Sequence, residues 1–79
     1  MNSSNQKKLQ EIFVIILELD NKVDFNSLAK AHSVNWDSLA HVSLVAAIES
    51  EFSLQLDASE IESINSFLET KLLLEEKGC

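Results

Sequence analysis

Residues 36–52 read WDSLAHVSLVAAIESEF, and this stretch decides how the rest of the chain is interpreted. Asp37 is a good helix N-cap, because its side chain can accept hydrogen bonds from the free backbone N–H groups that follow it. Ser38 is then the first residue of the most apolar helix in the sequence, which we expect over about residues 37–51. A phosphate ester on Ser38 would lie at the positive end of this helix, where free N–H groups and the helix dipole favour negative charge. The stretch therefore predicts a site suited to a phosphorylated serine.

Two apolar stripes run along this helix when its residues are placed at intervals of about 100°. The wider stripe contains His41, Leu44, Val45, Ile48 and Phe52. The narrower stripe, on nearly the opposite side, contains Leu39, Val42 and Ala46, and acidic residues edge it at Asp37, Glu49 and Glu51. A helix on the surface of a small domain buries one broad face, so we expect the wider stripe to face the core. Leu39, Val42 and Ala46 then form an exposed docking strip for partner proteins, unless both stripes are buried.

A first helix is expected over about residues 4–19, where apolar residues recur at helical spacing. Ser3 and Gln6 have the spacing of a capping box at its start. The residues expected to face the core are Leu9, Ile12, Phe13, Ile16 and Leu19.

Two more helices follow the central one, each opened by residues with capping-box spacing. Asp57 and Glu60 precede a short helix near residues 58–63. Ser66 and Glu69 open a last helix that ends near Glu76. The core register of this last helix stays open, because its apolar residues leave Lys71 on or near any apolar face; these residues are Phe67, Leu68, Leu72, Leu73 and Leu74.

Residues 20–36 are expected to form a long loop that isolated apolar residues pin to the core: Val23, Phe25, Leu28 and Val34. Asn26 could cap a brief helical turn that extends to Ala31. Asp20, Asp24 and Asn26 have the spacing of calcium ligands, but Lys22 stands at a ligand position. Phe25 and Ala31 replace the glycine and the closing glutamate that such a loop requires. We therefore predict a structural loop without a metal site.

The composition limits the architecture and the class of function. A chain of 79 residues buries only about 60% of its unfolded surface, so we expect one domain over residues 1–79 that has no deep catalytic cleft and is not an enzyme. The absence of proline and the single glycine favour long helices over hairpins. We predict an all-α four-helix bundle, with three main helices, one short helix and a long loop between the first two helices.

The charge balance of 13 acidic and 6 basic residues gives a net charge of −7 at pH 7. Such acidity opposes binding to nucleic acid or anionic membranes and suits basic protein partners. The single cysteine, Cys79, provides neither a disulfide framework nor a metal quartet, which favours a reducing compartment. No stretch has the roughly 20 apolar residues of a membrane helix, and no complete signal peptide is visible. We expect a monomeric cytoplasmic protein.

Residues 36–68 resemble the acyl carrier proteins. The residues that carry the resemblance are Trp36-Asp37-Ser38-Leu39, Val42, Leu44-Val45, Ile48-Glu49, Glu51-Phe52 and Ile64-Asn65-Ser66-Phe67. The tripeptide Asp37-Ser38-Leu39 is weak evidence alone, but its combination with an apolar helix that closes on Glu-Phe in a small acidic chain is specific. The resemblance implies that a separate magnesium-dependent phosphopantetheinyl transferase attaches 4'-phosphopantetheine from coenzyme A to Ser38, flanked by Asp37 and Leu39. It also implies partners that load and transfer acyl groups through basic docking patches.

The chain departs from the family pattern at several positions. Carriers of primary fatty-acid synthesis typically have acidic residues where this chain has Ser43 and Ser50. Asn35-Trp36 replaces the glycine common before the Asp-Ser pair, and the proline usual near Asp57 is missing. These departures indicate a specialised, free-standing carrier that serves a dedicated pathway.

Three other functions remain as alternatives. An aminoacyl or peptidyl carrier would have the same attachment motif, and a helical interaction module would need no prosthetic group. A serine hydrolase would pair Ser38 with His41 on adjacent turns, but the chain has no glycine-rich turn for an oxyanion hole and no evident carboxylate to orient the histidine. We expect His41 to be a hydrogen-bonded core or boundary residue and His32 to be solvated.

Overall fold

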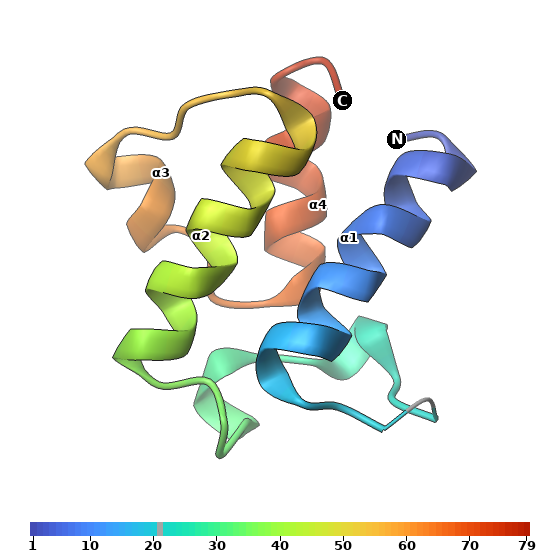
Figure 1. The fold of residues 1–79 in the computed structure, drawn as a ribbon, viewed down its shortest axis with the longest axis vertical. Coiled ribbons are helices and arrows are strands. Elements are labelled where there is room, and N and C mark those ends of the chain that lie inside the picture. Colours follow the sequence, from blue (N-terminus) through green and yellow to red (C-terminus); the bar gives the residue numbers. More distant parts are fainter. Residues whose placement is uncertain (21) are drawn as a thin grey trace.

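A computed structural model of the chain describes residues 1–20 and 22–79 and contains four α-helices joined by loops (Figure 1). Their bounds are Ser3–Leu17 for α1, Ser38–Phe52 for α2, Ala58–Glu62 for α3 and Phe67–Glu76 for α4. In Figure 1, α1 and α2 lie in front, α4 lies behind them, and the short α3 lies on the α2 side. The all-α prediction, with one short helix and a long loop between the first two helices, is confirmed. Within the described residues, no helix has both the length and the apolar character needed to cross a membrane.

The starts of the last three helices follow the predicted caps. The Asp37 side chain accepts a hydrogen bond from Ala40 N at 2.9 Å, so α2 begins at Ser38. Asp57 and Glu60 form the reciprocal capping box that opens α3. Ser66 Oγ accepts from Glu69 N at 3.0 Å and opens α4. In each case a polar side chain satisfies a backbone N–H group that has no partner inside the helix.

The predicted capping box at the start of α1 is wrong. The N-cap is Asn2, whose side chain accepts from Asn5 N at 2.8 Å, so α1 begins at Ser3. The helix also ends at Leu17, two residues before the predicted end, because Glu18 adopts a left-handed conformation with φ 52° and ψ 48°. Glu18 N and Leu19 N both donate to Val14 O, which satisfies a carbonyl of the last turn.

One hydrophobic core is shared by the helices; α3 contributes no fully buried residue, but its Ile61 packs against the core as a partly buried side chain. Phe13 of α1 lies at its centre and makes edge-to-face contacts with Trp36 and Phe67, at centroid distances of 5.4 and 5.3 Å. The wider stripe of α2 faces this core, as predicted, through Leu44, Val45 and Ile48. The residues of the core are Leu9, Phe13, Leu17, Leu28, Trp36, Leu44, Val45, Ile48, Leu56, Ile64, Phe67 and Leu74.

Two details of the predicted core differ from the structure. Leu17 is fully buried although the periodicity of α1 did not include it, whereas Ile12, Ile16 and Leu19 are only partly buried. Phe52, expected as an anchor of α2, is also only partly buried and lies at the edge of the core. Leu17 continues the row of buried residues that Leu9 and Phe13 form at four-residue spacing, and the end of α1 leaves Leu19 in the loop.

The long loop is held against the start of α4 by two backbone hydrogen bonds. Lys30 N donates to Asn65 O at 2.8 Å, and Phe67 N donates to Leu28 O at 3.0 Å. The loop contains two short 3₁₀ turns, η1 at Phe25–Ser27 and η2 at Lys30–His32. The cap of η1 is Asp24 and not the expected Asn26. Of the predicted pinning residues, Leu28 is buried, but Val34 is 98% exposed and pins nothing.

Candidate functional site

Ser38 occupies the first position of α2, with an exposed side chain at the end of the long loop. Asp37 precedes it in an extended conformation, with φ −97° and ψ −173°, and turns the chain into the helix. The Asp37 carboxylate accepts from Ala40 N, and the Asp37 carbonyl accepts from His41 N at 2.9 Å. The chain therefore presents the Ser38 hydroxyl outward at a rigidly capped helix start.

The backbone at this site has donors to offer to an anion. The cap satisfies the N–H group of Ala40, but the N–H groups of Ser38 and Leu39 have no acceptor among residues 1–20 and 22–79. Free N–H groups at a helix N-terminus, together with the helix dipole, stabilise a phosphate group. The site therefore fits a phosphodiester on Ser38 Oγ, with Asp37 keeping the helix start in place and Leu39 contributing one of the two free donors.

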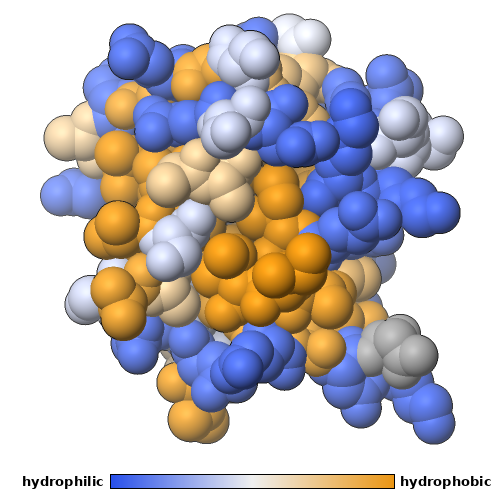
Figure 2. All heavy atoms as spheres, in the orientation of Figure 1, coloured by the Kyte–Doolittle hydropathy of each residue, from blue (hydrophilic) through white to orange (hydrophobic). Residues whose placement is uncertain are grey.

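The predicted docking strip is exposed on the outer side of α2. Leu39 is 76% exposed and Val42 is 66% exposed, and Ala46 on the next turn is exposed as well. Figure 2 shows hydrophobic atoms at the surface over α1 and α2, with hydrophilic residues around them. Burial of both stripes is therefore wrong, and an apolar strip begins directly beside Ser38.

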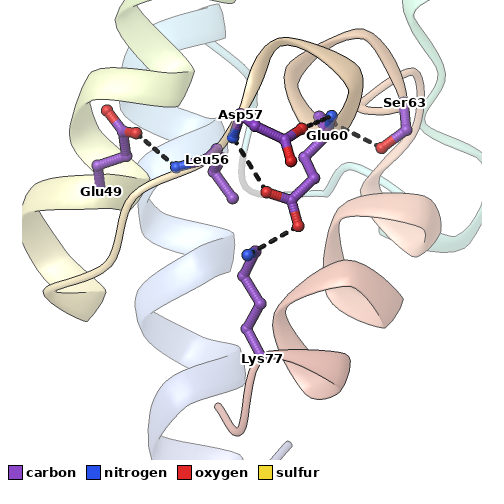
Figure 3. Close-up of polar contacts among 6 residues, drawn as sticks. All are labelled: Glu49, Leu56, Asp57, Glu60, Ser63 and Lys77. Carbon is purple, nitrogen blue, oxygen red and sulfur yellow. Dashed lines mark hydrogen bonds and ion pairs between the residues drawn. The ribbon is translucent and has the colours of Figure 1, made fainter.

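The acidic residues at the edges of the strip also make contacts within the protein. Glu49 Oε2 accepts a hydrogen bond from Leu56 N at 2.8 Å (Figure 3). Glu51 Oε1 lies 4.0 Å from Lys8 Nζ, and both side chains are about half exposed. Asp37 serves as the cap of α2. The role of these three carboxylates in docking stays a prediction.

His41 uses both of its ring nitrogens on groups other than Ser38. Trp36 Nε1 donates to His41 Nδ1 at 3.1 Å, and His41 Nε2 lies 3.0 Å from Ile61 O. The imidazole is thus hydrogen-bonded on both sides at the boundary of the core, as expected for His41, and it is not oriented as a base for Ser38. His32 is exposed in the loop, also as expected.

Two surface grooves lie away from Ser38. A groove of about 290 Å³ between α1 and the loop is lined by Lys7, Gln10, Glu11, Val14, Ile15, Val23 and Phe25. A groove of about 270 Å³ beside α4 is lined by Ser63, Glu69, Leu72, Leu73 and Glu76. No family model, curated protein or solved structure matches the chain. The interpretation of the site therefore depends on the geometry around Ser38 and on the residues that resemble acyl carrier proteins.

Sequence reasoning missed two residues near the site. Val34 lies in the loop four residues before Ser38 and is almost fully exposed, not an anchor of the loop. Its signal in the sequence is an apolar residue inside a polar segment. Trp36 is 3% exposed and holds His41, a contact that sequence spacing alone does not reveal.

Proposed function

We propose that the protein is a carrier that holds acyl groups as thioesters on a 4'-phosphopantetheine arm attached to Ser38. It delivers these groups to the enzymes of one dedicated pathway in the cytoplasm. The observation that supports this best is the exposed Ser38 hydroxyl at the first position of α2, beside the free N–H groups of Ser38 and Leu39. The resemblance of residues 36–68 to acyl carrier proteins supports the same function from the sequence.

Attachment would join Ser38 Oγ to the phosphorus atom that carries pantetheine in coenzyme A. The new O–P bond forms as the bridging bond of the pyrophosphate breaks. Adenosine 3',5'-bisphosphate leaves, and the hydroxyl proton passes to a base of the transferase. The attached group supplies a terminal thiol that carries the acyl group. Ser38 is then a substrate, and the chain's own part is to expose the hydroxyl and to stabilise the negative charge of the diester at the helix N-terminus.

The docking strip of Leu39, Val42 and Ala46 gives partner enzymes an apolar contact next to Ser38. Asp37, Glu49 and Glu51 surround this contact with negative charge, which favours partners that have basic patches. A small apolar contact with exposed charges around it gives weak, fast association that salt weakens. Such binding suits a carrier, which must leave each enzyme after transfer.

The test is the intact mass of the chain after incubation with coenzyme A and a promiscuous phosphopantetheinyl transferase. The wild-type chain gains the mass of one phosphopantetheinyl group, and Ser38→Ala gains none. Ser50→Ala is the matched control, because Ser50 is an exposed serine on the same helix, and this variant is modified like the wild type. Ser38→Ala changes the free energy of unfolding by no more than about 0.5 kcal/mol, as is usual for an exposed position.

Three results would overturn the proposal. An unmodified wild-type chain would favour the helical interaction module without a prosthetic group, and modification of Ser38→Ala would place the attachment elsewhere. A modified chain that accepts amino acids and not acyl groups on its thiol would identify an aminoacyl carrier, since both classes share this attachment chemistry.

A further inference from the structure

Trp36, His41 and Ile61 form a hydrogen-bonded bridge that joins three parts of the molecule, and we call it the His41 bridge. Trp36 belongs to the segment that leads into Ser38, His41 lies on the first turns of α2, and Ile61 lies on α3. The bridge therefore brackets Ser38, with one member two residues before it and another three residues after it. It is a tertiary contact, since Ile61 is separated from His41 by 20 residues.

The chemistry of the two partners determines the protonation state of His41. An indole N–H can only donate, so His41 Nδ1 must accept and carries no proton. The carbonyl of Ile61 can only accept, so Nε2 carries the proton and donates to it. The ring centroids of Trp36 and His41 are 6.2 Å apart and the planes differ by 23°. With the nitrogens 3.1 Å apart, this is an in-plane N–H···N bond and not a face-to-face contact.

The bond to Ile61 matters because α3 has little else to hold it. This helix has five residues, none of them fully buried, and it makes few contacts with the other helices. The Ile61 carbonyl belongs to the last turn of α3, where it also accepts from Ile64 N at 3.3 Å. His41 thus supplies one tether of α3, and the ion pair between Glu60 and Lys77 supplies another.

Protonation of His41 would break the bridge on the Trp36 side. A proton on Nδ1 turns the acceptor into a donor that faces the indole N–H, and the buried Trp36 then has no partner in reach. No carboxylate among the described residues hydrogen-bonds to His41 to compensate for a positive charge. Asp37 caps Ala40 N, Glu60 pairs with Lys77, Glu62 is exposed on α3, and residues 33–36 carry no charged group.

We propose that His41 is a positioning residue for the Ser38 site. In its neutral form, with the proton on Nε2, it holds the segment before Ser38 and α3 against α2. Protonation of His41 releases the segment, so that Ser38 is presented less well to a modifying enzyme. The effect on modification rests on the proposed carrier function, whereas the bridge itself does not.

The bridge is tested first on the unmodified wild-type chain by NMR of the two histidine rings and the single indole N–H signal. At pH 8, the proton of His41 is on Nε2 and the indole N–H of Trp36 exchanges slowly. On acidification, the indole signal moves with the titration of His41 and not with that of exposed His32, which serves as the internal control. Two results would contradict the bridge: a His41 proton on Nδ1 at pH 8, or an indole N–H signal whose chemical shift does not change when His41 is protonated.

Modification of Ser38 is tested with variants that keep one half of the bridge. His41→Asn keeps an acceptor for Trp36 and cannot titrate, whereas His41→Gln keeps a donor for Ile61 O and loses the acceptor. The ratio of wild-type to His41→Asn modification rates cancels the transferase's own pH dependence. We expect this ratio to fall severalfold between pH 8 and pH 5.5, because protonation of His41 leaves the buried indole donor of Trp36 unpaired.

His41→Gln should be modified slowly at every pH, because it resembles the acid form. A wild-type rate for both variants across this range would overturn the positioning role. If the wild-type chain is not modified at any pH, the carrier function fails instead, and the NMR result still decides the bridge. A variant that fails to fold is replaced by Trp36→Phe, which keeps an aromatic ring in the core and removes the indole donor. The ratio of wild-type to Trp36→Phe modification rates should then fall between pH 8 and pH 5.5, and a ratio that stays constant over this range would contradict the proposal.

Discussion

Glu49 Oε2 accepts a hydrogen bond from Leu56 N at 2.8 Å, and this contact fastens the last turn of α2 to the connector that leads to α3 (Figure 3). The chain reverses at Ser53, which caps α2 in a left-handed conformation with φ 53° and ψ 50°. The connector then runs back beside the helix. There the Glu49 carboxylate accepts from the backbone N–H of Leu56, whose side chain is buried. Glu49 is therefore a structural residue as well as a charge beside the docking strip.

Two substitutions distinguish the structural role of Glu49, as the acceptor for Leu56 N, from its role as a charge beside the docking strip. Glu49→Gln keeps a neutral acceptor oxygen for Leu56 N and should lower the free energy of unfolding by less than Glu49→Ala does. Glu49→Ala removes the acceptor and should lower it by about 1.5–3 kcal/mol, the usual range for a hydrogen bond to a charged group. Urea unfolding measures both. Glu51→Ala is the control and should cost less than about 1 kcal/mol, because its contact with Lys8 is exposed; an equal loss in this control would contradict the structural role of Glu49.

The docking strip should be sensitive to a charge that the rest of the surface tolerates. Val42→Asp should slow modification of Ser38 severalfold, because a carboxylate replaces an apolar contact next to the attachment point. Leu72→Asp is the matched control, since Leu72 is 59% exposed on α4 against 66% for Val42 on α2. Circular dichroism checks that both variants fold. Equal rates for Val42→Asp and the wild type, or equal slowing by Leu72→Asp, would show that the strip is not the docking surface.

The acidic residues at the edge of the strip should raise the rate at which the chain associates with the transferase. Glu49→Gln combined with Glu51→Gln removes two charges beside the strip while keeping the acceptor for Leu56 N. Modification should slow most at low ionic strength, and the difference from the wild type should fade near 1 M salt, where the screening length is about 3 Å. The same two-charge change on α4, Glu69→Gln with Glu76→Gln, serves as the control. Slowing of equal size in this control would mean that only net charge matters.

Local signals in the sequence were sufficient for most of the fold. The caps at Asp37, Asp57 and Ser66 act on the next three residues, so their effect can be read from adjacent positions. The cap of α1 was misplaced because Asn2 and Ser3 are neighbours of similar capping ability, and local rules do not choose between them. Local rules also missed the end of α1, which depends on a non-glycine residue, Glu18, in a left-handed conformation.

The features that could not be predicted from the sequence, the register of α4 and the partners of His41, depend on contacts between distant residues. The register of α4 was open because three leucines follow one another; the structure buries Leu74 and exposes Leu72, since Phe67 and Thr70 already face the core. The exposed site at Ser38 and its strip followed from helix periodicity. The partners of His41 did not, because Ile61 reaches it from α3, 20 residues away, and the Trp36 ring is placed by its packing on Phe13.

The centre of the core should be more sensitive to truncation than its edge. Phe13 is fully buried and packs edge to face on Trp36 and Phe67, so Phe13→Ala should lower the free energy of unfolding by about 3–5 kcal/mol. Phe52 is only partly buried, and Phe52→Ala should cost roughly half of that or less. Urea unfolding of the two variants gives the comparison. A loss at Phe52 as large as that at Phe13 would mean that the end of α2 is packed more tightly than the structure shows.

The ion pair between Glu60 and Lys77 should make the stability of the fold depend on pH. Lys77 Nζ lies 2.7 Å from Glu60 Oε2 and ties α3 to the end of α4 (Figure 3). The hydrogen bond from the Lys77 ammonium, and next the one from Asp57 N, lower the pKa of the Glu60 carboxyl from its usual value. The same pair raises the pKa of Lys77. The folded chain therefore binds a proton at Glu60 less readily than the unfolded chain does.

The sign of the effect follows from this difference. The contribution of Glu60 is fully present above the usual titration range of glutamate, near about pH 4.3, and is lost as the pH falls through the lower pKa of the folded state. Glu60→Gln keeps an acceptor for Asp57 N but removes the ion pair, so it should be less stable than the wild type at pH 6 and equal to it in strong acid. Urea unfolding from pH 2 to pH 7 measures the difference, and Glu69→Gln, an exposed change on α4, is the control. A difference between Glu60→Gln and the wild type that stays constant over this range would contradict the ion pair as its source.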